Sequence, residues 1–342
     1  MRKTNLTFRL VFAASLAASI MTGRPASADE KFVFIAVSPP SGYMLPMYVA
    51  QDQGFYKSAG LDFEIKTVGG DQNGVRALLT GVGQVTVIGA PVLYEAVTND
   101  AKVKGIGGGN QTLTDYFLVL GKGKGTTLKD AANKTLAISN PGSMPQLIPG
   151  MMFKKAGIDA SQTKYVPVGG YSARLQAVAA GKVDGTLIDA LTSLRGEKEG
   201  ISVTVADANV VLERPLGYTF NVTTQEQLDN PAKRKVLAAF VKATMMGARF
   251  IVDKPDEAAN ILSKQFKGDV PLELVQETVA KLNHGKVWGL NGGVGKELHD
   301  YTMQAYLETK LVSKSVDYKD AFDPSLADQA LKELGKRDGG WQ

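Results

Sequence analysis

The chain is 342 residues long, carries a formal net charge of +5, is 44% hydrophobic and contains no cysteine. A chain of this length can bury a substantial core, and the missing cysteine excludes disulfides, a thiolate nucleophile and a lipid-anchoring cysteine. The two histidines, His284 and His299, have no carboxylate at metal-ligand spacing, and neither a G-x-S-x-G nor a G-x-x-x-x-G-K-[ST] motif is present. We therefore expect neither a metal site nor these forms of catalysis.

Residues 1–28 are typical of a secretory signal sequence. Arg2 and Lys3 precede an apolar run over 10–21, and Ala26-Ser27-Ala28 forms an A-x-A cleavage site. The apolar run is short for a membrane span, so an uncleaved anchor helix is the less favoured alternative. Cleavage lowers the net charge from +5 to +1, which removes the main support for nucleic-acid binding. We expect a soluble protein exported to a periplasm.

The chain after residue 28 alternates short apolar strands with amphipathic helices, a pattern typical of open α/β sheets. In chain order we expect strands at 32–37, 63–68, 85–88, 103–106, 116–120, 136–138, 183–188 and 201–205. Helices are expected at 45–59, before Gly81, at 91–99, before Gly157, before Gly181, and at 231–252, 255–266, 271–282 and 297–309. The glycine-rich run 121–125 and the segment 215–222 are predicted to cross between two lobes.

Val68–Ala90 and Val168–Ala190 share residue types at a constant offset of one hundred positions. Both segments contain a Gly-Gly turn, a helix that ends at a glycine, and a β-branched strand, which predicts one βαβ unit used twice. We expect the two strands of each unit to form a parallel pair. Ligands bind at the carboxyl ends of such strands, so the turns there are candidate binding sites.

The two copies differ at turn positions within this shared scaffold. Asp71 stands against Tyr171, and Ala90 stands against Asp189. A structural requirement would be shared by both copies, so these differences indicate ligand contacts. Helix N-capping is the alternative role for both aspartates.

A resemblance to a known family rests on three phrases. AQDQGFYKSAGLDFEI at 50–65, SNPGSM at 139–144 and GKVDGTLID at 181–189 resemble the substrate-binding proteins of ABC importers in the sulfonate/nitrate/taurine and NMT1/THI5-like group. The resemblance implies a type II periplasmic binding protein: two α/β lobes, each an open, mostly parallel sheet flanked by helices, joined by two crossovers and closing by a hinge. We therefore expect lobe I at 29–121, lobe II at 122–214, and a return to lobe I with C-terminal helices at 215–342.

Two kinds of binding chemistry are expected in the cleft of such a protein. The turn from Ser139 to Ser143 opens a helix, where unpaired N–H groups favour an anion, although an ordinary Ser N-cap is the alternative. Tyr43 could stack on a ring or pack against the helix below it. Arg76 and Arg174 fall within helices and are expected to face solvent, so no arginine clamp for a dianion is predicted. The candidate ligand contacts are Ser38, Ser41, Tyr43, Asp71, Ala90, Asn110, Ser139, Gly142, Ser143, Tyr171 and Asp189.

The resemblance implies a monomeric binding protein, without cofactor or enzymatic activity, that passes a small molecule to an ABC permease. Sulfonates, aromatic carboxylates and pyrimidine-like compounds are the implied ligands. An exported enzyme on the same bilobal fold and a periplasmic sensor or adaptor are the alternatives. The cysteine-rich active segment of the eukaryotic pyrimidine-synthesising relatives is absent from the sequence, which argues against their self-consuming chemistry.

Overall fold

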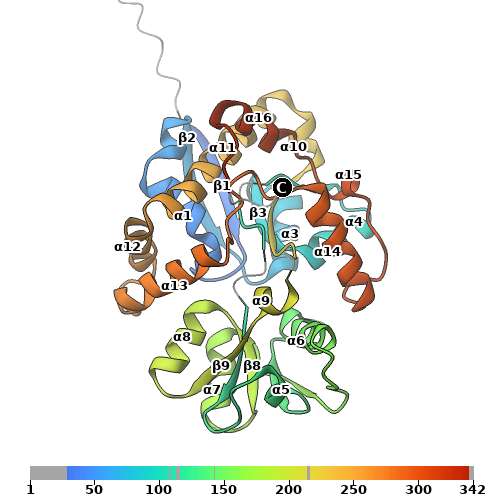
Figure 1. Cartoon of the computed structure of the whole chain (residues 1–342). Coiled ribbons are helices and arrows are strands. Elements are labelled where there is room, and N and C mark those ends of the chain that lie inside the picture. The colour runs from blue at the N-terminus through green and yellow to red at the C-terminus, as the bar shows by residue number, and fades with distance from the viewer. Residues whose placement is uncertain (1–28, 108, 113–115, 142, 214–215, 339–342) are drawn as a thin grey trace, which may run out of the picture.

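The computed structural model describes residues 29–107, 109–112, 116–141, 143–213 and 216–338. These residues form two lobes, each built on a five-stranded sheet with helices on its faces (Figure 1). The expected signal segment 1–28 lies outside the described residues. Within them, no helix is both long enough and apolar enough to cross a membrane.

The two sheets have the same topology. The strand order is β2-β1-β3-β10-β4 in lobe I and β7-β6-β8-β5-β9 in lobe II. Each sheet is mixed, because β10 runs antiparallel to β3 and β4, and β5 runs antiparallel to β8 and β9. The strands are β1 Glu30–Ala36, β2 Leu61–Thr67, β3 Val85–Gly89, β4 Val103–Gly105, β5 Phe117–Gly121, β6 Thr135–Ile138, β7 Lys164–Pro167, β8 Gly185–Ile188, β9 Ser202–Asp207 and β10 Thr219–Thr224.

The expected repeat is present, but its two strands are not direct neighbours. β1 and β6 each lie between the two strands of a repeat unit and pair in parallel with both. The equivalence extends to single hydrogen bonds: Oγ1 of Thr86 donates to the carbonyl of Ile35 at 3.0 Å, and Oγ1 of Thr186 donates to that of Ala137 at 2.9 Å. The two units are therefore the same structure built twice.

The position of the first crossing differs from the sequence-based expectation. Phe117–Gly121 pairs with β8 and β9 in the second sheet, so the chain leaves lobe I between Gly105 and Phe117 and not at 121–125. The glycine-rich run is instead a turn within lobe II, where Gly123 has a φ of +81°. The second crossing is close to its expected place, since β9 ends at Asp207 in lobe II and β10 begins in lobe I.

Helices surround both sheets. The expected helix 45–59 is divided in two, because Gly54 adopts a φ of +70° between α1 and α2. A 3-10 turn, Gly42–Met44, precedes α1. The helices are α1 Leu45–Asp52, α2 Phe55–Ser58, α3 Asp71–Leu79, α4 Ala90–Thr98, α5 Leu128–Ala131, α6 Met144–Lys155, α7 Tyr171–Ala179, α8 Ala190–Lys198, α9 Ala208–Leu212, α10 Gln225–Asp229, α11 Pro231–Asp253, α12 Pro255–Gln265, α13 Leu272–His284, α14 Lys296–Glu308, α15 Tyr318–Ala321 and α16 Ser325–Leu334.

The C-terminal third of the chain completes the core of lobe I. In Figure 1 the helices from α10 onward, coloured yellow to red, surround the lobe I sheet. Phe240 of α11 stacks on Phe32 of β1 with ring centroids 4.9 Å apart, and Tyr56 stacks on Phe63 at 4.0 Å. Such pairs add directional ring contacts to the burial of large apolar surface. Lobe I is thereby the larger of the two.

Candidate functional site

A cleft of about 1590 Å³ lies between the lobes, and both sheets contribute to its walls. The turns after β1, β2 and β3 line it on one side, and the turns after β6, β7 and β8 line it on the other. These are the carboxyl ends of parallel strands, where open α/β sheets bind ligands. The volume exceeds the roughly 300–1,000 Å³ typical of small-molecule pockets.

Most residues selected from the sequence line this cleft. They come from separate turns and helix starts in both lobes, which only the folded chain brings together. The residues that line it are Ser38, Ser41, Tyr43, Asp71, Ser139, Ser143, Tyr171 and Asp189. Gly142 lies outside the described residues.

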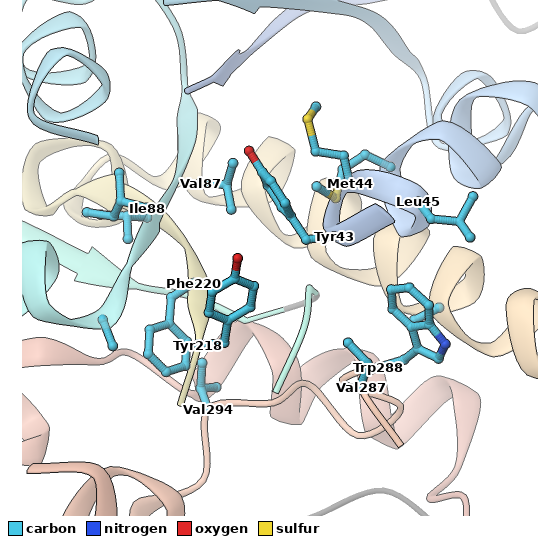
Figure 2. Packing of buried hydrophobic residues seen from close by; sticks show 14 of the residues in the cluster. Tyr43, Met44, Leu45, Val87, Ile88, Tyr218, Phe220, Val287, Trp288 and Val294 are labelled. Carbon is cyan, nitrogen blue, oxygen red and sulfur yellow. The ribbon is translucent and has the colours of Figure 1, made fainter. Parts of the chain in front are cut away.

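Tyr43 stands in the lobe I wall, in the 3-10 turn before α1. Its hydroxyl lies 2.8 Å from Oγ of Ser38, and its ring meets the ring of Tyr218 edge-on with centroids 6.4 Å apart (Figure 2). Burial raises the pKa of Tyr43 to about 12, so the phenol is neutral near pH 7 and can donate or accept a hydrogen bond. The side chain both packs against its neighbours and lines the cleft.

Asp71 is the first residue of α3, and Gly70 is the N-cap, so the alternative of N-capping is wrong for Asp71. Its Oδ2 accepts a hydrogen bond from the N–H of Gly89 at 2.8 Å, which ties together two of the turns that line the lobe I wall. Burial raises the pKa of the carboxyl, and the bond from Gly89 opposes that shift. Oδ1 has no hydrogen-bond partner among the described residues.

The lobe II wall contains the start of α6. Ser143 is the N-cap of this twelve-residue helix but makes no side-chain capping bond. Ser143, Met144 and Pro145 line the cleft, so the first turn of α6 opens onto it. Ser143, Gln146 and Leu147 already donate their N–H groups within this turn, and Pro145 has none, so the positive end of the helix dipole is what favours an anionic or electronegative group at this wall.

Arg174 of α7 differs most from expectation, because it is 1% exposed and lines the lobe II wall. Its Nε donates to Oγ1 of Thr186 at 3.1 Å, its Nη2 to the carbonyl of Leu187 at 3.0 Å, and its Nη1 to the carbonyl of Gly169. The centre of the guanidinium lies 5.0 Å from the centroid of the Tyr171 ring, a cation–π distance. The expectation that Arg174 faces solvent is therefore wrong.

The repeat explains where this arginine lies. The position one hundred residues earlier is Gly74, and a Cβ placed there would come within 2.6 Å of Val37 and 2.8 Å of Thr86. Lobe I leaves no room for a side chain at this point, whereas lobe II holds the arginine in the equivalent space. Arg76, the other arginine selected from the sequence, is exposed as expected.

Asp189 is the N-cap of α8 and is 6% exposed. Its Oδ1 accepts a hydrogen bond from the N–H of Thr192 at 3.1 Å, so the capping alternative is correct, although the residue also lines the cleft. Burial raises the pKa of this carboxyl, while the bonds from Thr192 and the charge of Arg174 oppose the shift. The residue that caps the equivalent helix in lobe I is Gly89. Asp189 therefore corresponds to Gly89, and the sequence-based comparison of Asp189 with Ala90 was wrong by one residue.

Ala90 and Asn110 are not among the residues that line the cleft. Ala90 is fully buried as the first residue of α4, and its N–H donates to the carbonyl of Tyr218 at 2.9 Å. Asn110 is 3% exposed, and its Nδ2 donates to the carbonyl of Tyr43 at 3.0 Å and to Oγ1 of Thr219 at 3.3 Å. Asn110 thus positions Tyr43 and does not itself reach the cleft.

Two further tyrosines line the cleft where the chain passes between the lobes. Tyr116 directly precedes β5 and Tyr218 directly precedes β10, and their rings meet edge-on with centroids 5.3 Å apart. The carbonyl of Tyr116 accepts a bond from Ala208 of lobe II, and that of Tyr218 accepts one from Ala90 of lobe I. Each tyrosine is thereby fixed to the lobe that its strand enters. The sequence signal that could have identified this pair is a tyrosine directly before each strand that follows a passage between the lobes.

The histidines have the packing and surface roles expected from the sequence. His299 is 3% exposed, with Nδ1 3.2 Å from the hydroxyl of Tyr94 and Nε2 3.1 Å from the carbonyl of Val316, and burial lowers its pKa. His284 is exposed at the end of α13. In the part of the chain that the structure describes, no three His, Cys, Asp or Glu side chains are grouped to hold a metal. The cleft offers hydrogen bonds, aromatic faces and charge, which are means of binding.

Comparison with known proteins places these features in a family. The model of the NMT1/THI5-like family matches residues 41–258. YtlA from Bacillus subtilis, a proposed binding protein, is 28% identical over 160 residues. That alignment covers 45% of this chain and spans 48% of YtlA, about half the length of this curated relative.

Solved structures with the same fold cover nearly the whole chain. The ligand-binding component of an ABC-type import system from Staphylococcus aureus, with zinc bound, superposes with a TM-score of 0.71 at 15% identity, covering 88% of this chain and 99% of that one. The nitrate-binding protein NrtA from Synechocystis has a TM-score of 0.70 at 14% identity, with 91% and 90% covered. The aliphatic sulphonate-binding protein SsuA from Escherichia coli has a TM-score of 0.65 at 14% identity, with 87% and 93% covered.

Proposed function

We propose, from the premise that the chain belongs to the NMT1/THI5-like family, that it is the solute-binding component of an ABC importer. It would capture a small polar or anionic organic molecule in the cleft and deliver it to the permease. The observation that supports this proposal most directly is that two sheets with the same strand order direct their carboxyl edges toward a single cleft. Ligand contacts from both walls can then be satisfied together only when the lobes approach each other.

Hinge closure is the mechanism that this geometry supports. The described chain passes between the sheets at two places, beside Tyr116 and Tyr218, so rotation there moves the lobes with little change inside either. A ligand that contacts both walls stabilises the closed state by its differential affinity for that state. The permease would then recognise surface features present only after closure.

Two ion pairs that join the lobes are compatible with such motion. Lys198 of α8 in lobe II lies 2.9 Å from Glu277 of α13 in lobe I, and Lys154 of α6 lies 3.5 Å from Glu308 of α14. The side chains of the first pair are each 42% exposed and those of the second 75% and 52%, and ion pairs with such exposure contribute only about 0–1 kcal/mol each. They orient the lobes without locking them.

The ligand class follows from the walls. The start of α6 favours a carboxylate, a sulfonate or another electronegative group, while Tyr43, Tyr116 and Tyr218 offer ring faces and edges. Sulfonates, aromatic carboxylates and pyrimidine-like compounds remain the proposed candidates, and nitrate-binding and sulphonate-binding proteins share the fold. We further propose that residues 1–28 direct the protein to the periplasm and that it is a monomer there.

A thermal-shift screen tests this function, with sulfonates, aromatic acids, pyrimidines and flavins as the probes. A ligand present at one hundred times its Kd stabilises the folded state by about 2.7 kcal/mol. At roughly 2 °C per kcal/mol for a chain of this size, the melting temperature should rise by about 5 °C. Stoichiometric retention of the compound supports transport, whereas its conversion to product would favour an exported enzyme. The absence of any shift across the screen would contradict the proposal.

A further inference from the structure

The two walls of the cleft differ in charge at two pairs of positions that the repeat relates. In lobe I the first residue of the helix after the Gly-Gly turn is Asp71, and the fourth is Gly74. In lobe II the corresponding residues are Tyr171 and Arg174. Of the two positions, lobe I therefore has the carboxylate of Asp71 but no arginine, and lobe II has the guanidinium of Arg174 but no carboxylate. Of these four residues, Asp71, Tyr171 and Arg174 line the cleft, and Gly74 does not.

Asp71 has unused binding capacity. One carboxylate oxygen accepts the N–H of Gly89, and the other has no hydrogen-bond partner among the described residues. No Lys, Arg or His of the described chain lies within ion-pair distance of this carboxylate. Asp71 is half-buried, and a partly desolvated carboxylate without a counter-charge is unfavourable, so a ligand that brings an N–H donor or a cation there relieves that cost.

Arg174 supplies a positive charge and N–H donors to the lobe II wall. A guanidinium carries five N–H donors, and the three bonds to Thr186, Leu187 and Gly169 do not use them all. Asp189, the carboxylate whose charge acts on Arg174, is engaged as the cap of α8 and makes no ion pair with it within 4 Å in the described structure. Together with the start of α6, this wall favours a hydrogen-bond acceptor or an anion.

We propose that the ligand is dipolar, with an amino group or other N–H donor directed to Asp71 and a carboxylate or similar anionic group directed to the lobe II wall beside Arg174. Its body, a ring, lies among Tyr43, Tyr116 and Tyr218. This inference rests on the proposed function, because it names the ligand class for the same cleft. A purely anionic ligand of similar size would place negative charge near Asp71 without compensating it.

Three probes of matched shape test the inference: 4-(aminomethyl)benzoate has both ends, 4-ethylbenzoate lacks the amine, and benzylamine lacks the carboxylate. Titration calorimetry on the purified chain should give at least tenfold tighter binding for the first than for either of the others. Asp71→Asn keeps an oxygen for the Gly89 bond but loses the charge, so it should reduce the preference over 4-ethylbenzoate at least fivefold. Asp62→Asn changes an exposed acid of lobe I that is not among the residues lining the cleft, and it should leave that preference within twofold.

The outcomes separate this inference from the function on which it rests. Equal or tighter binding of 4-ethylbenzoate, or a preference that Asp71→Asn leaves unchanged, would overturn the dipolar assignment. Binding of methanesulfonate or nitrate at one site per chain, without binding of 4-(aminomethyl)benzoate, would overturn the assignment while supporting the transport function. Failure of all five compounds to bind would count against both.

Discussion

Replacement of Arg174 by methionine should destabilise the protein by about 3 kcal/mol. The buried guanidinium donates to the carbonyls of Gly169 and Leu187 and to the hydroxyl of Thr186, and each hydrogen bond from a charged group contributes about 1.5–3 kcal/mol. Removing the charge also removes the desolvation cost of burying it, so the net loss is smaller than the sum of the three bonds. Methionine retains much of the apolar volume, which limits any cavity contribution.

Urea unfolding followed by circular dichroism measures this difference. With an m-value of about 3 kcal/mol per molar for a chain of this size, the midpoint should fall by about 1 M. Arg76→Met is the matched control, because Arg76 occupies the corresponding helix of lobe I but is exposed, and its midpoint should move by less than about 0.2 M. Equal shifts for the two variants would refute the assignment of Arg174 to the lobe II interior.

Three other changes test further parts of the structure. Gly74→Ala should cost about 1–3 kcal/mol in urea unfolding because its Cβ would overlap Val37, whereas Gly150→Ala, in open space on α6, should be neutral or stabilising; equal effects would contradict the packing. Burial raises the folded-state pKa of Asp71 above its ordinary 3.8, so its ionisation opposes folding as pH rises. Asp71→Asn should therefore be the more stable protein at pH 7, with the difference vanishing below about pH 3.8; a less stable variant at pH 7 would reverse the sign. Tyr56→Phe should lower the unfolding free energy by about 1 kcal/mol through loss of the 2.8 Å bond to Thr244, and an unchanged value would show that this bond contributes nothing.

The strands and the repeat could be predicted because their signals are local. Apolar runs such as Phe32–Val37 and the matched units Val68–Ala90 and Val168–Ala190 specify elements whose type depends on nearby residues. The first crossing was misplaced for the opposite reason. Glycines at 121–125 indicate a turn but carry no information on which sheet receives the preceding strand, and that pairing of Phe117–Gly121 is made with residues more than sixty positions away.

The candidate site was predicted in the same uneven way. Turn residues such as Asp71 and Ser139 were found because the topology places strand ends at one edge of the sheet, whichever side chains surround them. The burial of Arg174 was not predicted because which face of a helix is buried depends on the space left by neighbouring elements. In lobe I, Val37 and Thr86 fill the space beside Gly74, whereas the equivalent space in lobe II accommodates the arginine side chain. Asn110 was chosen for its place after three glycines, yet the bond to Tyr43 that defines its role spans two distant segments.

Small-angle X-ray scattering of the purified chain, with and without the compound that gives the largest thermal shift, tests the central claim most directly. The cleft of about 1590 Å³ predicts that the radius of gyration decreases when the ligand binds, because contacts from both walls draw the lobes together. A radius that stays unchanged at saturating ligand, with one molecule bound per chain, would contradict capture by hinge closure.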